Sequence, residues 1–422
     1  MKKMIVKGGQ TLAGEVTIGG AKNSTVALIP AAILADTPVK FDSVPDILDV
    51  HNLMLILKSL NVTSKFGHGE LEIDPTKIKE AALPGNAIRS LRASYYFMGA
   101  LLGRFGQATV GFPGGDNIGP RPIDQHIKGF KALGARVEEG ENEVHITTGP
   151  EGLKGARIFF DLVSVGATIN VLLAAVRAKG TTIMENVARE PEIIDLATFL
   201  NNMGAHIRGA GTDVIRIQGV DRLEARNTHT IIPDRIEAGT YLSFAAANGK
   251  GVLVKNVIPE HLDPFIAKLV EMGVNLEIDE DQIYVPGGDF LAPITVKTSP
   301  FPGFATDLQQ PITPLLMRAH GKSTIIDTLY PERIKHIPEM KRMGGKIESK
   351  DGVITVGNSP KLTGAVVNAS EIRAGVSLLG LALMAEGTTV IEHADHILRG
   401  YDRIVEKFGN LSVNLEVVTE TV

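Results

Sequence analysis

Apolar and polar residues follow one pattern that recurs about every 70 residues along the chain. In each copy an apolar helix ends at a glycine or another small residue, and a short strand, a turn and a second strand follow. The residues that mark the end of the apolar helix are Leu60, Leu133, Met203, Met272, Met343 and Phe408. This regularity predicts six structural repeats.

A second shared pattern lies upstream of these markers. A helix rich in small apolar residues is followed by glycine and a β-branched strand, as in "SVGATINVLLAAVRAKGTTIMENV". The fifth repeat shows the same pattern, which predicts a helix within residues 306–320. Helices that are apolar nearly all round are typical of buried helices. We therefore expect an α/β fold of two three-repeat domains, each with its first helices inside and its sheets outside.

The domain boundaries follow from the repeat count. Domain I is expected to span residues 22–231 and to carry a mobile glycine-rich loop at 111–122. Domain II would combine residues 1–21 with 232–422, because the opening strand precedes the first helix and can complete the second domain. The polar stretch 221–230 is the best linker candidate. Two chain crossings between the domains predict a hinged cleft.

Composition excludes several classes of protein. The chain of 422 residues has a formal net charge of −5 and no basic tract, so no nucleic-acid partner is expected. The longest apolar run, at 376–385, is about half a membrane span. The absence of cysteine rules out disulfides and thiolate metal sites. These features fit a cytoplasmic protein whose length predicts two domains, and we expect it to be a monomer.

Charged residues gather where strands lead into helices. A helix N-terminus offers free N–H groups and the positive end of the helix dipole, so it attracts anions. These junctions carry Lys22, Asn23, Arg92, Ser164, Asp234, Arg235, Glu237, Asp307, Glu371 and Arg373, while Arg121 and Arg399 lie in loops. Any one of them can simply cap a helix. Six such junctions in one acidic protein favour binding of phosphates or carboxylates.

Other motifs are weaker. "HGKST" at 320–324 lacks the first glycine of a phosphate-binding loop, and "GAGTDV" lacks the third glycine of a dinucleotide fingerprint. "EHADH" at 392–396 has ligand-type residues but follows a strand within one repeat, so a surface loop is favoured over a metal site.

Several motifs together resemble one family. They are "GGAKNS", "GGDNIGPRPID", "SVGAT", "AREPEIID", "PDRIEAGT", "PGFATDLQQP" and "HILRGYDRI", and they span essentially the whole chain. They resemble the bacterial UDP-N-acetylglucosamine enolpyruvyl transferases, whose fold is a two-domain inside-out α/β barrel. The related enolpyruvyl-shikimate-phosphate synthases share that architecture and are the alternative. They lack this loop form and the "PDRIEAGT" stretch. A non-enzymatic repeat scaffold that binds anionic partners is a second alternative.

The resemblance implies a reaction. The 3-hydroxyl of the sugar adds to C2 of phosphoenolpyruvate, C3 is protonated, and phosphate then leaves an enol ether. This reaction would begin peptidoglycan synthesis and needs an anion clamp, a base and an acid. It implies no metal and no other cofactor, and its partners are two small-molecule substrates.

The resemblance also implies residue roles. Phosphoenolpyruvate would be held by Lys22, Arg121, Arg333, Arg373 and Arg399. UDP-N-acetylglucosamine would be held by Asn23, Arg92, Arg121, Pro122, Ile123, Asp124, Ser164, Val165, Gly166, Asp307 and Leu329. The catalytic residues would be Lys22, Asn23, Asp116, Asp307 and Arg399. Asn23 would contact the tetrahedral intermediate, and Asp307 would take the proton of the sugar hydroxyl.

Two positions depart from the pattern common in the family. Asp116 stands where many members have a loop cysteine, and it would act as general acid or assist product release. An aspartate after Gly-Gly is also a common turn former. Glu371 stands where many members have aspartate, so its role is less defined by the resemblance.

Overall fold

The chain divides into two compact units, each with its own apolar core. The structure is a computed structural model that describes residues 1–83, 95–112, 118, 122–288 and 290–421. Unit 1 contains Met1–Gly19 and Pro233–Val422, and unit 2 contains Gly20–Gly115 and Pro120–Ile232. One cluster of buried apolar residues lies in unit 2, and a second, separate cluster lies in unit 1. Each unit is therefore stabilised by its own core.

The described residues of unit 2 form three sheets. Their strand orders are β13-β3-β5-β4, β6-β8-β7 and β11-β12-β10-β9. The strands are β3 (Val39–Asp42), β4 (Thr63–Gly67), β5 (Glu70–Asp74), β6 (Gln107–Gly111), β7 (Arg136–Glu139), β8 (Glu143–Thr147), β9 (Arg157–Phe159), β10 (Thr181–Glu185), β11 (His206–Arg208), β12 (Val214–Gln218) and β13 (His229–Thr230).

Three further sheets form from the described residues of unit 1. Their orders are β15-β16-β14-β2, β17-β18-β20-β19 and β21-β22-β1-β23. The strands are β1 (Lys2–Lys7), β2 (Leu12–Thr17), β14 (Gly249–Lys255), β15 (Glu277–Ile278), β16 (Gln282–Val285), β17 (Thr295–Lys297), β18 (Ser323–Ile326), β19 (Ile347–Lys350), β20 (Val353–Val356), β21 (Val366–Asn368), β22 (Thr388–Glu392) and β23 (Leu415–Thr419).

One pairing scheme recurs in the four-stranded sheets. A parallel pair is extended by two antiparallel strands, as in β9-β10 followed by β12 and β11. The N-terminal strands complete unit 1, because β2 pairs parallel with β14 and β1 pairs with β22 and β23. The N-terminal strands therefore belong to two of the sheets of unit 1.

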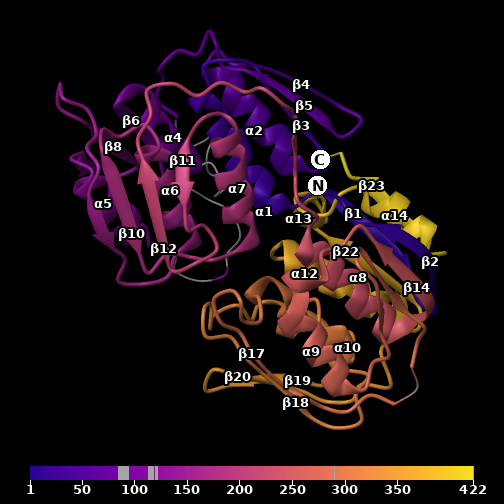
Figure 1. Ribbon diagram of the computed structural model, residues 1–422. Coiled ribbons are helices and arrows are strands. Elements are labelled where there is room, and N and C mark those ends of the chain that lie inside the picture. The colour runs from indigo at the N-terminus through magenta and orange to yellow at the C-terminus, as the bar shows by residue number, and fades with distance from the viewer. Residues whose placement is uncertain (84–94, 113–117, 119–121, 289, 422) are drawn as a thin grey trace. The chain divides into compact units, whose positions relative to one another are not determined.

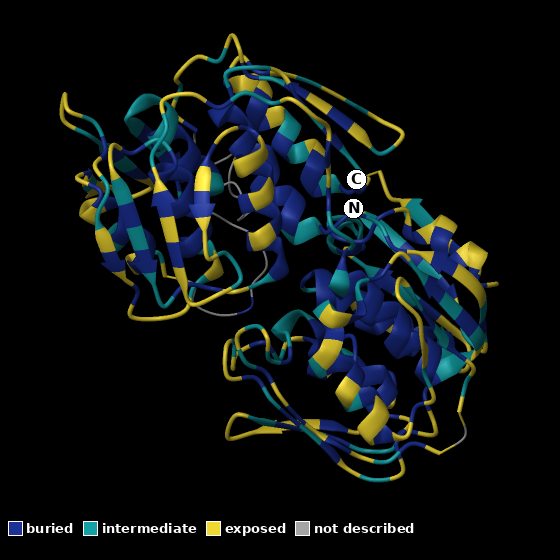
Figure 2. Ribbon diagram, viewed as in Figure 1, coloured by how far each residue is buried: buried dark blue, intermediate teal, exposed yellow. Residues whose placement is uncertain are grey.

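Apolar helices lie inside each unit, as their composition predicts (Figures 1 and 2). In unit 2 they are α1 (Lys22–Ala31), α4 (Tyr96–Phe105) and α6 (Val165–Ala175), and in unit 1 they are α8 (Arg235–Asn248), α10 (Thr313–Leu316) and α12 (Ile372–Met384). Every residue of α12 from Ile372 to Leu383 is buried. In unit 1 the three helices pack against one another, whereas in unit 2 α4 packs against both α1 and α6.

The remaining described helices have one exposed face, except α13, whose residues are buried or half-buried. They are α2 (Leu48–Ser59), α5 (Asp124–Ala132), α7 (Pro191–Asn202), α9 (Asp263–Met272), α11 (His336–Arg342), α13 (Asp395–Leu398) and α14 (Ile404–Asn410). The short 3₁₀ helices among the described residues are η1 (Ala32–Leu34), η3 (Pro259–Leu262) and η4 (Thr306–Leu308).

The predicted helix within residues 306–320 is the clearest departure. The structure has the 3₁₀ turn η4 followed by the four-residue helix α10. Pro311 and Pro314 lie in this stretch, and a proline has no N–H to donate to the preceding turn. The chain is therefore broken into two short pieces, and Asp307 lies in the first of them.

The chain changes unit after the stretch that the sequence indicated as a linker. Within 221–230, Leu223 is buried and its N–H donates to Asp36 at 2.9 Å, so this stretch packs in unit 2. The change instead falls between Ile232 and Pro233. In the part of the chain that the structure describes, no helix combines the length and apolar character needed to cross a bilayer.

Candidate active site

The guanidinium of Arg333 is buried in unit 1 and pairs with two carboxylates. Its Nε and one terminal nitrogen donate to the two carboxylate oxygens of Glu371, both at 2.9 Å. Both side chains are almost fully buried. Burial disfavours the cation, but Glu371 and Asp307 outweigh it, and the pKa of Arg333 is raised. This bidentate pair joins the loop after β18 to the N-cap of α12.

Asp307 lies between two arginines. Arg333 donates to one carboxylate oxygen at 3.0 Å, and Arg373 lies 3.6 Å from the other. The Asp307 side chain is 27% exposed, whereas each arginine is 3% exposed. The carboxylate is thus oriented by buried cations but keeps access to solvent, as a base acting on a bound hydroxyl requires.

Arg373 lies in the first turn of α12, and its guanidinium can accept a further anionic partner. Its guanidinium lies over the ring of Tyr401 at 5.2 Å from the ring centroid. Burial opposes its charge, but Tyr401, Asp307 and Asp234 together raise the pKa of Arg373. One terminal nitrogen is buried without a hydrogen-bond partner among the described residues. A buried guanidinium N–H without an acceptor indicates a place for an anion.

Asp327 holds the loops that carry this cluster. One of its oxygens accepts from Thr298 at 2.8 Å and from the N–H groups of Leu329 and Tyr330 at 3.1 and 2.9 Å. The other accepts from Thr306 at 2.6 Å, next to Asp307. The side chain of Leu329 is exposed. Asp327 therefore fixes both η4 and the start of the loop to Arg333.

In unit 2, α1 presents Lys22 and Asn23 in its first turn. The Lys22 ammonium lies 3.5 Å from the Asp49 carboxylate, which is fully buried. The next residue, Ser24, donates to Asp195, and His229 lies 2.9 Å from the other oxygen of Asp195. These contacts fix the direction in which α1 begins.

A second part of the predicted site in unit 2 lies at two neighbouring helix starts. Ser164 caps α6 by accepting from the Ala167 N–H at 3.1 Å, so Val165 and Gly166 form the first turn. Pro122 and Ile123 lead into Asp124, the first residue of α5. A Cβ on Gly166 would lie 3.0 Å from the His126 ring, so glycine permits this close approach of α5 and α6. The structure thus brings 122–126 and 164–166 together.

Of the remaining predicted site residues, the structure describes Arg399 but not the other three. Arg399 follows α13 as its C-cap and is half-buried. Arg92, Asp116 and Arg121 lie outside the described residues. Sequence reasoning missed Asp327, Gln310 and Tyr401, although "LQQ" beside Asp307 and "GYDR" beside Arg399 were available signals. Gln310 donates to Glu371 and thereby completes the buried cluster.

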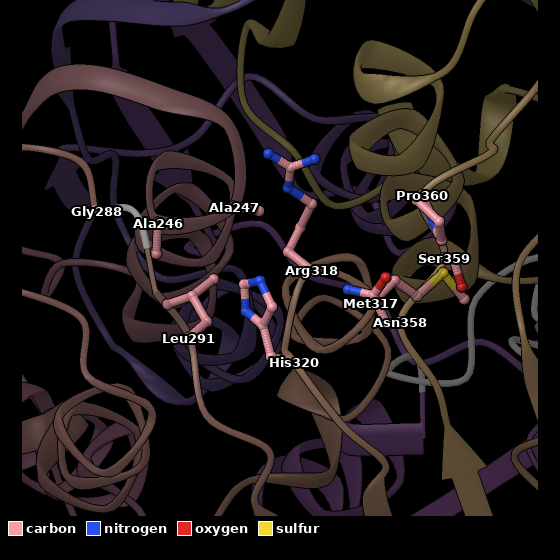
Figure 3. Close-up of a pocket in the computed structure, with 10 residues that line it drawn as sticks. All are labelled: Ala246, Ala247, Gly288, Leu291, Met317, Arg318, His320, Asn358, Ser359 and Pro360. Carbon is pink, nitrogen blue, oxygen red and sulfur yellow. The ribbon is translucent and has the colours of Figure 1, made fainter.

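A cavity of about 310 Å³ occurs elsewhere in unit 1 (Figure 3). It lies at the C-terminal ends of α8 and α10, where Ala247, Met317, Arg318 and His320 contribute to its wall. None of the residues predicted to bind substrate lines it. Asp307 and Arg373 lie instead at helix starts, so we do not assign the reaction to this cavity.

The fold is that of the enolpyruvyl transferases. The enolpyruvyl transferase NikO from Streptomyces tendae superposes with a TM-score of 0.89 at 23% identity, over 100% of this chain and 99% of that one. An EPSP synthase from Acinetobacter baumannii superposes with a TM-score of 0.71 at 19% identity, over 99% of this chain and 100% of that one. Residues 6–408 match the family model of EPSP synthase (3-phosphoshikimate 1-carboxyvinyltransferase).

Within that fold the chain belongs to the UDP-N-acetylglucosamine 1-carboxyvinyltransferase family. It is 67% identical over 420 residues to UDP-N-acetylglucosamine 1-carboxyvinyltransferase 2 of Lactiplantibacillus plantarum, covering 100% of this chain and 99% of the relative. It is 61% identical to the protein of the same name from Latilactobacillus sakei, with both chains covered completely. The resemblance drawn from the sequence motifs, and the enzyme class that it implied, are confirmed.

The geometry around Arg333 predicts how stability responds to acid. His336, at the start of α11, is buried and lies near Arg333, and these two causes hold the pKa of His336 at about 3. The unfolded chain therefore binds a proton that the folded chain excludes. The stabilisation is complete above about pH 6.5 and is lost as pH falls toward the folded pKa, by about 1.4 kcal/mol per pH unit.

We expect His336→Asn to flatten this pH dependence, because asparagine cannot be protonated in the unfolded chain. Urea denaturation at several pH values between about 6.5 and about 4 would measure the slope. His320→Asn, at an exposed histidine, is the control and should keep the wild-type slope. Equal slopes for His336→Asn and the wild type would contradict this interpretation.

Proposed function

We propose that this chain transfers the enolpyruvyl group of phosphoenolpyruvate to the 3-hydroxyl of UDP-N-acetylglucosamine and releases phosphate. One observation carries the proposal: a carboxylate, Asp307, is held between two buried arginines, and Arg373 retains a buried nitrogen without a partner among the described residues. A base beside an anion clamp is the equipment that this addition–elimination reaction needs. The reaction would be the first committed step of peptidoglycan synthesis, in the cytoplasm and by a monomer.

The steps balance without a change in oxidation state. The sugar O3 bonds to C2 of phosphoenolpyruvate, its proton goes to Asp307, and an acid adds a proton to C3. The C2–O bond to phosphate then breaks, C3 returns a proton to the conjugate base of that acid, and the enol ether and inorganic phosphate are released. We assign the acid to Asp116 and contact with the tetrahedral intermediate to Asn23.

We assign a set of residues to the binding of each of the two substrates. Lys22, Arg121, Arg333, Arg373 and Arg399 would hold the phosphate and carboxylate of phosphoenolpyruvate. The residues proposed for the sugar nucleotide are Asn23, Arg92, Arg121, Pro122, Ile123, Asp124, Ser164, Val165, Gly166, Asp307 and Leu329. The start of α6 supports this assignment, because the first N–H groups of a helix point out of its N-terminus and the positive end of its dipole suits a diphosphate. Glu371 differs: both of its oxygens are engaged by Arg333, which supports a structural role.

We expect purified protein to release phosphate from phosphoenolpyruvate only when UDP-N-acetylglucosamine is added. A colorimetric phosphate assay checks this, and mass spectrometry of the nucleotide should show the added enolpyruvyl group. Release with shikimate 3-phosphate in place of the sugar nucleotide would favour the alternative substrate. No release with either acceptor would favour the non-enzymatic alternative.

For the base, Asp307→Asn keeps the side-chain shape and removes the basicity. We expect kcat to fall roughly 10²- to 10⁴-fold. The KM for phosphoenolpyruvate should not rise, because loss of the carboxylate leaves the arginine charges less compensated. Asp351→Asn is the matched control, since Asp351 is exposed in a turn with φ of 51°, which asparagine tolerates equally. Near-normal turnover of Asp307→Asn would refute the assignment of the base to Asp307.

The resemblance carries a further prediction for Asp116, which lies outside the described residues. Fosfomycin inactivates cysteine-containing members of the family when the loop thiolate opens its epoxide. A carboxylate is a weaker nucleophile than a thiolate, and the chain contains no cysteine. We expect the protein to resist covalent inactivation and Asp116→Cys to become sensitive over time. Intact mass would measure labelling, and stoichiometric labelling of the unaltered protein would refute the prediction.

A further inference from the structure

Tyr401 is a buried tyrosine that the proposed reaction does not use directly. It lies two residues after Arg399 and is 2% exposed. Its hydroxyl oxygen is 2.8 Å from the Thr240 hydroxyl on α8, and its ring faces the Arg373 guanidinium on α12. Tyr401 thus connects two of the three central helices of unit 1 at the position of an arginine proposed to bind substrate.

The hydrogen bonds of this group have a defined direction. Thr240 has one hydroxyl hydrogen, and it donates that hydrogen to the Ile236 carbonyl at 2.8 Å. The Tyr401 hydroxyl must therefore donate to Thr240. Its oxygen lone pairs remain available as acceptors toward Arg373, a residue that can only donate. A side-chain hydrogen bond with Tyr401 also helps to raise the pKa of Arg373, so donation runs from the guanidinium through Tyr401 and Thr240 to the backbone of α8.

The residue after Tyr401 is anchored to the same helix. Asp402 lies 3.1 Å from the Lys407 ammonium, which lies 2.7 Å from Glu237. All three side chains are at most 5% exposed. Glu237 and Thr240 are three residues apart on α8 and so lie on one face of it. The segment 401–402 is therefore held on α8 by the Tyr401–Thr240 hydrogen bond and by the ion pairs of Lys407 with Asp402 and Glu237. These buried interactions fix the position of the Tyr401 ring.

We propose that Tyr401 is a positioning residue that orients Arg373 toward phosphoenolpyruvate, an inference that rests on the proposed function. Two carboxylates also attract Arg373, namely Asp307 at 3.6 Å and Asp234. Asp307 changes charge when it takes the sugar proton, and its attraction for Arg373 then weakens. Tyr401 is neutral throughout, so it holds the guanidinium in place at the step when Asp307 cannot.

Tyr401→Phe keeps the ring and removes the hydroxyl, and Tyr241→Phe is its matched control. Tyr241, which lies on α8, is buried like Tyr401, but its hydroxyl has no hydrogen-bond partner among the described residues. For Tyr401→Phe we expect kcat/KM for phosphoenolpyruvate to fall about tenfold, as for loss of a hydrogen bond to a charged group. The KM for UDP-N-acetylglucosamine should stay within about twofold of wild type, and Tyr241→Phe should change neither value beyond about twofold.

A double-mutant cycle with Arg373→Lys separates positioning from a general effect on folding. If Tyr401 acts through Arg373, the two substitutions together should cost less in kcat/KM than the product of their separate effects. Strictly multiplicative effects would overturn the inference, and so would equal changes for both substrates or equal effects of the two Tyr→Phe variants. Thermal melts of all variants report on folding. An inactive wild-type protein would refute the proposed function instead, so the two failures are distinguishable.

Discussion

A buried guanidinium needs carboxylates nearby to compensate its charge. In unit 1, the need to compensate Arg333 fixes the positions of the segments around it. Removing one partner of such a buried pair typically costs about 3–5 kcal/mol, because the other charge is left without compensation. Both oxygens of Glu371 meet this demand, and Gln310 donates to the same carboxylate. The start of α12, the loop after β18 and the turn η4 are consequently held in one arrangement. The orientation of Asp307 follows from it.

The two short helices of the fifth repeat, η4 and α10, help to position the polar side chains around Asp327 and Arg333. A continuous helix over 306–320 would pair the N–H groups beyond its first turn with carbonyls one turn earlier. The prolines at 311 and 314 prevent that, and Thr306 and Gln309 contact Asp327 and the Arg333 carbonyl through their side chains. The broken helix thus places polar side chains of one segment on two neighbouring loops.

The sequence allowed the repeat frame to be inferred because the signals are local. Glycines end apolar helices, and the residues that begin the next helix can then be located; Lys22, Ser164 and Arg373 were found at helix starts in this way. Contacts between repeats have no such signal. Arg333 and Glu371 are 38 residues apart, and nothing in either stretch indicates that they pair. Tyr401 reads as an ordinary core aromatic, because its hydrogen bond to Thr240 spans 161 residues.

The charges of the cluster suggest why its carboxylates differ in exposure. Arg333 and Arg373 are balanced by Glu371 and Asp307, so the resting cluster is close to neutral. Glu371 is buried and saturated by Arg333, whereas Asp307 is 27% exposed and shared by both arginines. In the proposed reaction Asp307 is neutralised by the sugar proton, and one arginine charge is then uncompensated. The uncompensated arginine charge arises while the tetrahedral intermediate forms. The intermediate still carries the negatively charged phosphate, so it is attracted to that arginine. A low-dielectric site strengthens such an attraction, so proton uptake by Asp307 and anion binding by Arg373 would support each other.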